Sequence, residues 1–177
     1  HSFPTRRSSD LEQIVTGQYE MWLPVSYVLN EGTAFFYPTE ERTLTIPSTS
    51  SRVLTVGAYD ATAMTYADFS GRGKENKDNQ KPDLAAPGVN VISVQGQGGY
   101  AAFTGTSFAT PFAAGGAALL MEWGMIEKND PFLYGEKAKA YLRRGARQLP
   151  GFEVWPNNQL GYGALCVRDS IPETRLS

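Results

Sequence analysis

The chain has 177 residues, enough to bury one sizeable hydrophobic core in a single domain. Hydrophobic residues make up 41% and charged residues 19% of it, as in an ordinary globular protein. The net charge of −2 and the lack of a basic cluster argue against a nucleic-acid partner. The longest apolar stretch, residues 108–121, is too short to span a bilayer, and the one cysteine, Cys166, rules out a disulfide within the chain.

The N-terminal segment, residues 1–11, resembles a sequencing-library adapter translated in one frame. We therefore expect it to be non-native and leave it out of the fold prediction, with a native N-terminal arm as the alternative. The same resemblance predicts that the chain begins inside a longer gene. Because His1 is the one histidine in the sequence, residues 12–177 supply no imidazole for catalysis.

Residues 12–46 carry β-branched and aromatic residues in short runs that are interrupted by Pro24 and Pro38 and followed by Pro47. This pattern predicts two or three short antiparallel strands. We expect the aromatic side chains here to pack in a core rather than to bind a ligand; they are Trp22, Phe35, Phe36 and Tyr37.

Two apolar runs further along, Val53–Tyr59 and Val89–Val94, are typical of strands buried on both faces. We expect these two strands to pair in one parallel sheet, with residues 83–87 as the segment that leads into the second. The loop 96–99 is rich in glycine but lacks the lysine and the spacing of nucleotide-binding loops, so no cofactor is predicted. No carboxylate cluster indicates a metal site.

Two helices are expected after the strands. The stretch 107–123 consists of small and apolar residues on all sides, which predicts a buried helix. The sequence Asp130-Pro131 is a strong helix start, and this second helix should run to about Arg147. Its expected buried side is Phe132, Leu133, Ala138, Tyr141 and Leu142, and its arginines Arg143, Arg144 and Arg147 suit a helix C-terminus, which indicates a structural role.

A polar turn, Gly105-Thr106-Ser107, directly precedes the first helix. Gly105 permits backbone conformations that a β-carbon forbids, and Thr106 or Ser107 can cap the helix. A hydroxyl at a helix N-terminus also lies beside unpaired N–H groups that favour a developing negative charge, so Ser107 is a candidate nucleophile. The local pattern by itself favours the capping role.

Four segments, in their order and spacing, resemble the C-terminal half of the catalytic domain of the subtilisin-like serine proteases (subtilases). They are Val53–Ala58, Phe69–Gly73, Lys81–Gly88 and Gly105–Pro111, the last being similar to the family's nucleophile motif Gly-Thr-Ser-x-Ala-x-Pro. The resemblance implies a three-layer α/β fold with a mostly parallel sheet, present as a partial domain over residues 47–177.

Flanking segments at 22–24, 43–47, 121–124, 129–135 and 160–166 look like the clostridial branch of the subtilases, which includes the germination proteases of spores. Members of this branch carry a jelly-roll domain inserted upstream of the serine. The resemblance therefore implies that residues 12–46 are the end of an inserted β-rich region. It also implies an extracellular or spore-associated protein.

In this family Ser107 would be the catalytic nucleophile, and its own backbone N–H would be one donor of the oxyanion hole. Gly105, Thr106 and Pro111 would be supporting residues of the motif. The family's catalytic aspartate and histidine and its oxyanion asparagine precede the serine motif and are absent here. We therefore expect the chain alone to be inactive, with the upstream half of the same domain as its partner.

Other residues in matching positions are not assigned to catalysis. Asp60, Asp68 and Asp83 lie in segments that correspond to other parts of the family pattern, and Phe112 stands where the family has a non-catalytic histidine. The parent protein is expected to be a serine endopeptidase acting on protein or peptide substrates. The alternatives are a pseudoprotease that serves as a binding or regulatory module, and an unrelated α/β binding domain.

Overall fold

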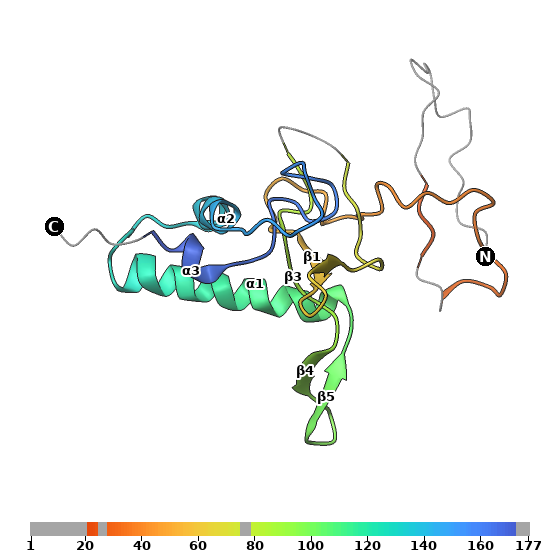
Figure 1. The fold of residues 1–177 in the computed structure, drawn as a ribbon, viewed down its shortest axis with the longest axis horizontal. Coiled ribbons are helices and arrows are strands. Elements are labelled where there is room, and N and C mark those ends of the chain that lie inside the picture. The colour runs from red at the N-terminus through yellow and green to blue at the C-terminus, as the bar shows by residue number, and fades with distance from the viewer. Residues whose placement is uncertain (1–20, 25–27, 75–78, 173–177) are drawn as a thin grey trace, which may run out of the picture. The chain divides into compact units, whose positions relative to one another are not determined.

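The computed structural model describes residues 21–24, 28–74 and 79–172, and the chain divides into two units, residues 1–38 and 39–177 (Figure 1). The adapter-like residues 1–11 lie outside the described part. In the first unit, residues 21–24 and 28–38 form turns and irregular backbone.

The strands predicted within 12–46 are absent from 21–24 and 28–46, the part of that segment which the structure describes. Phe36 and Tyr37 are 97% and 96% exposed, so the prediction that they pack in a core is wrong. Short strands are stable only when they pair with further strands and cover an apolar surface. The Thr43 and Leu44 amides donate to the Arg72 carbonyl at 2.8 and 3.3 Å, and this contact is too short to form a strand.

The second unit is built on a three-stranded sheet in the order β2-β1-β3. β1 (Val56–Asp60) pairs in parallel with β3 (Leu84–Pro87), from Val56 opposite Leu84 to Tyr59 opposite Pro87. β2 (Thr65–Tyr66) adds an antiparallel pair at the other edge of β1. Ala58, Ala85 and Ala86 are fully buried at the centre, as expected for a sheet covered by helices.

The predicted pairing of 53–59 with 89–94 is wrong. β4 (Val91–Val94) instead pairs antiparallel with β5 (Tyr100–Phe103) in a separate two-stranded sheet. Ile92 and Val94 are 68% and 70% exposed, so this apolar run is not a core strand here. The parallel partner of β1 is the short Leu-Ala-Ala-Pro strand β3, whose small residues let α1 pack closely on the sheet.

Helix α1 (Thr106–Met121) confirms the first predicted helix and packs on β1 and β3. It continues into a π-helical turn, η3 (Glu122–Ile126). In Figure 1 the β4–β5 hairpin projects from the sheet at the N-terminal end of α1. The prediction that α1 is buried on all sides is wrong, because its buried residues, Ala109, Ala113, Gly116 and Leu120, form a single face.

Helix α2 (Gly135–Arg144) is shorter than predicted at both ends. Asp130 does not cap it; its carboxylate instead accepts from Lys137 Nζ at 2.6 Å and from the Tyr141 hydroxyl at 3.0 Å. Leu133, Ala138 and Leu142 are buried as expected, whereas Phe132 is 85% exposed. A last short helix, α3 (Val167–Ser170), packs beside α1 and α2.

Candidate active site

Ser107 is the second residue of α1, and its side chain is exposed. The N-cap position belongs to Gly105, which has a φ of 152° and makes no side-chain capping hydrogen bond. The Ser107 hydroxyl likewise has no hydrogen bond to the residues that the structure describes. The capping role, which the local pattern favoured, is therefore not the role that the structure shows for this serine.

The backbone around Ser107 offers free donors. The amides of Thr106 and Ser107 precede the first intrahelical hydrogen bond of α1, and neither donates a hydrogen bond within the described part of the chain. Unpaired amides at a helix N-terminus carry a partial positive charge that stabilises an anion. An oxygen that becomes negative beside Ser107 would meet this field without any rearrangement of the turn.

The turn itself is held by the loop that follows β3. The Gly105 amide donates to the Gly88 carbonyl at 2.8 Å, and the Asn90 amide donates to the Thr104 hydroxyl at 3.0 Å. A β-carbon on Gly88 would lie 2.6 Å from the Ala58 Cβ, so only glycine fits between β1 and this turn. Gly105 was expected from the sequence to shape this turn, whereas Gly88 and Asn90 were not singled out, although Gly88 lies within one of the family-like segments.

Aromatic and helical contacts complete the support. The rings of Phe103 and Phe108 stack at 4.9 Å on either side of the turn, and the Thr110 hydroxyl donates to the Thr106 carbonyl at 3.0 Å. Pro111 has no N–H, so the Ser107 carbonyl lacks its ordinary helical donor. The motif residues Gly105, Thr106 and Pro111 thus lie around Ser107 in the first turns of one helix.

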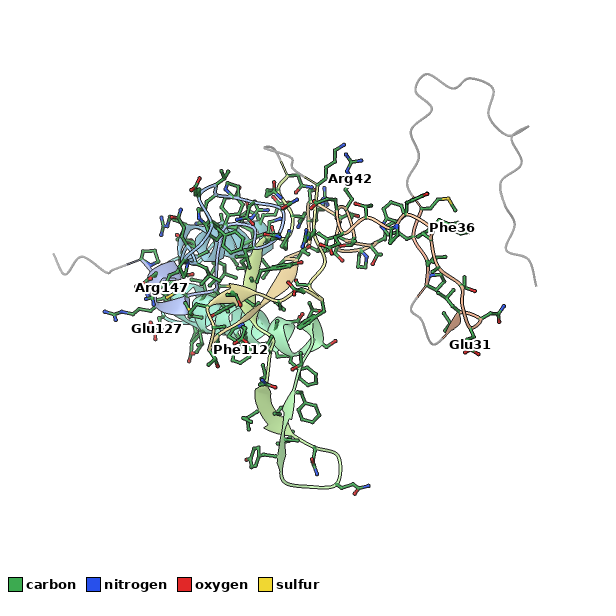
Figure 2. All side chains as sticks on the ribbon, turned by 45° about the vertical axis from the view of Figure 1, so that its right-hand side comes forward. Glu31, Phe36, Arg42, Phe112, Glu127 and Arg147 are labelled. Atoms are coloured by element: carbon green, nitrogen blue, oxygen red, sulfur yellow. The ribbon has the colours of Figure 1, made fainter. Side chains whose placement is uncertain are left out.

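Asp60, Asp83 and Phe112, which the sequence left unassigned to catalysis, make contacts of their own away from the Ser107 hydroxyl. Asp60 accepts from the amides of Thr62 and Ala63 in its own turn, at 2.8 and 3.1 Å. Asp83 is fully buried, and its carboxylate accepts hydrogen bonds from Lys81 and Arg143. Phe112 is 44% exposed on α1 (Figure 2). Within the described residues, no group of three or more metal-ligating side chains is placed to hold an ion. Nor does the described part contain a helix long and apolar enough to cross a membrane.

A partly parallel sheet is covered by a helix whose second residue is a serine, and this serine lies within the motif Gly-Thr-Ser-x-Ala-x-Pro. This is the arrangement of a subtilase. The sequence profile of the subtilase family (peptidase S8) matches residues 29–163, and the chain belongs to this family. The predicted family and the mixed α/β fold class with a partly parallel sheet are confirmed.

Relatives and solved structures show how much of such a protease is present. The serine protease AprX of Bacillus subtilis is 33% identical over 156 residues, covering 75% of this chain and 33% of that protease. The PII-type proteinase of Lactococcus lactis subsp. cremoris is 44% identical over 103 residues, covering 57% of this chain and 5% of that protease. The structure of the Clostridium perfringens CspB protease is 45% identical with a TM-score of 0.75, covering 80% of this chain and 30% of that one. The chain thus spans about a third or less of these relatives, and the similarity to CspB agrees with the resemblance to clostridial subtilases.

Proposed function

We propose that this chain is the C-terminal part of the catalytic domain of a serine endopeptidase, with Ser107 as its nucleophile. The observation that carries the proposal is the exposed Ser107 hydroxyl beside two free amides at the start of α1. The names of the family's relatives, which are serine proteases and proteinases, support the same reaction class. Residues 12–46 would be the end of an inserted jelly-roll region.

In the proposed reaction, Ser107 Oγ attacks the carbonyl carbon of the scissile peptide bond while its proton passes to a histidine. The carbonyl oxygen becomes negative and accepts a hydrogen bond from the Ser107 N–H, at the positive end of α1. The histidine then gives its proton to the leaving amine, which produces an acyl-enzyme on Ser107. Water hydrolyses this ester and restores the serine.

The histidine must come from the rest of the domain, because the one histidine in this sequence, His1, lies in the adapter-like segment. We expect its orienting aspartate and the second oxyanion donor to come from there as well. In subtilisin, another member of the family, loss of the serine or the histidine lowers kcat by about 10⁶-fold. We therefore expect the chain by itself to be inactive. Protein or peptide substrates would be cleaved outside the cytoplasm, as two further Bacillus subtilis relatives are named a cell wall-associated and a minor extracellular protease.

A fluorophosphonate probe tests the proposal. It should label Ser107 in the complete protease, and Ser107→Ala should abolish the label. Absence of labelling in a folded, complete protease would overturn the proposal and favour a pseudoprotease that acts as a binding or regulatory module.

A further inference from the structure

Ser107 depends on the backbone for its position, because its own side chain is not held. The hydroxyl is exposed and makes no hydrogen bond to the residues that the structure describes. The helix behind it also holds it less firmly than usual. Pro111 lacks the N–H that would bind the Ser107 carbonyl, and no side-chain cap closes the first turn of α1. The segment that precedes the serine must therefore supply the missing anchor.

That segment is tied by two hydrogen bonds to the chain that follows β3. The Gly105 amide donates to the Gly88 carbonyl at 2.8 Å, and the Asn90 amide donates to the Thr104 hydroxyl at 3.0 Å. Gly105 has a φ of 152°, and its backbone rotates more freely than that of a residue with a β-carbon. The Thr104 hydroxyl therefore fixes the chain directly before the one residue of the turn that has the most freedom.

The bond to Thr104 lies where the β4–β5 ladder ends. Val91 and Phe103 are the pair at this end of the ladder. Asn90 comes next, and its φ of 52° is a left-handed conformation that turns the chain out of the strand. Its amide is accepted by a side-chain hydroxyl instead of a backbone carbonyl. The hydroxyl thus closes the base of the hairpin at the residue from which the serine turn starts.

We propose that Thr104 is a positioning residue for the Ser107 nucleophile. By accepting from the Asn90 amide, its hydroxyl limits the rotation of Gly105 and keeps Ser107 Oγ in line with the carbonyl carbon that it attacks. A misplacement of about 1 Å can cost about 10²-fold in rate, so one hydrogen bond at this place has a large effect. Thr104 acts through the turn and not on the substrate. The inference rests on the proposed function, in which Ser107 is the nucleophile.

The kinetics of fluorophosphonate labelling of the complete protease test this role. Thr104→Val keeps the shape of the side chain but removes the acceptor, and it should lower the maximal rate constant of labelling about tenfold. The probe concentration that gives half this rate should stay the same, because Thr104 does not touch the probe. Thr104→Ser restores the hydroxyl and should label within about twofold of the wild type. The pH dependence of labelling should not move in either variant, since the proposed base is a histidine elsewhere in the domain.

Asn90→Val tests the other end of the same bond. A β-branched residue is poorly suited to a φ of 52°, so this change should displace the amide and slow labelling as Thr104→Val does. The double variant should be no slower than either single variant, because both changes remove the same interaction. Thr65→Val is the matched control, since Thr65 is also an exposed threonine at the end of a strand but belongs to β2. It should label like the wild type.

Amide hydrogen exchange of the complete protease separates this role from the proposed function. Thr104→Val should speed exchange of the Gly105 amide about fivefold, the factor that corresponds to one lost hydrogen bond, although its acceptor on Gly88 is unchanged. Faster exchange in a protease whose wild type the probe does not label would support the role of Thr104 in fixing the turn and refute the proposed function. Labelling of Thr104→Val at the wild-type rate would overturn the positioning role. A Thr104→Ser protease that labels as slowly as Thr104→Val would overturn it as well.

Discussion

The side chains of Asp83 and Arg143 meet in the interior although the residues lie 60 positions apart. Arg143 donates to Asp83 Oδ1 through Nη2 and through Nε, the latter at 2.9 Å. Lys81 Nζ and the Thr55 amide donate to Oδ2 at 2.7 and 2.5 Å, and Asp83 is fully buried. Burial lowers the pKa of Lys81, and the Asp83 carboxylate opposes this shift. The buried carboxylate thus ties α2 to the start of β3.

Arg143→Met should destabilise the chain by about 3–5 kcal/mol, because it removes one cation from a buried carboxylate without removing the carboxylate. The free energy of unfolding, from urea denaturation followed by circular dichroism, measures the loss. Arg144→Met is the control, since Arg144 is exposed and contacts the Tyr141 ring, and it should cost at most about 1 kcal/mol. Equal effects of the two substitutions would contradict the role of the Asp83 cluster.

Ser107→Ala should leave the free energy of unfolding within about 0.5 kcal/mol of the wild type, because the hydroxyl makes no capping bond. A capping serine would cost about 1 kcal/mol on the same change. Thermal and urea denaturation of the chain decide between them. A loss of 1 kcal/mol or more would restore the capping role.

Two adjacent glycines of α1 should respond in opposite directions to alanine. Gly115→Ala should stabilise by about 0.5–1 kcal/mol, since its β-carbon enters open space and alanine favours the helix. Gly116→Ala should destabilise by about 1–3 kcal/mol, because its β-carbon would lie 2.8 Å from Val167 Cγ2. Denaturation midpoints of the two variants report the difference. Stabilisation by both would show that α3 can move away from α1.

Acid should weaken the Asp169–Arg147 ion pair, whose Oδ2 and Nε atoms lie 2.6 Å apart. Hydrogen bonding from Arg147 lowers the pKa of Asp169 in the folded chain. Its contribution to stability is therefore complete above about pH 4, the usual unfolded pKa, and is lost as the pH falls through the lowered folded pKa. Asp169→Asn should flatten the pH dependence of unfolding in this window, and an unchanged profile would show that the pair contributes nothing.

The family, the helix after Ser107, the strand β1 and the serine motif could all be predicted from the sequence. Each of these depends on local order: a run of small apolar residues with a helical length, a β-branched run, and the fixed spacing from Gly105 to Pro111. Neighbouring residues create these signals, so they can be recognised without knowledge of the rest of the fold.

Which strands pair, where α2 begins and how much of α1 is covered depend instead on contacts between distant parts of the chain. Val91–Val94 is as apolar as a core strand, yet the chain pairs it with β5 and buries Ala85 and Ala86 instead. Asp130 is a strong capping residue, yet its carboxylate accepts hydrogen bonds from Lys137 and Tyr141, and α2 begins only at Gly135. The physical reason is the same throughout. Apolar patterning determines which faces of an element need to be covered, but residues distant in sequence supply the cover.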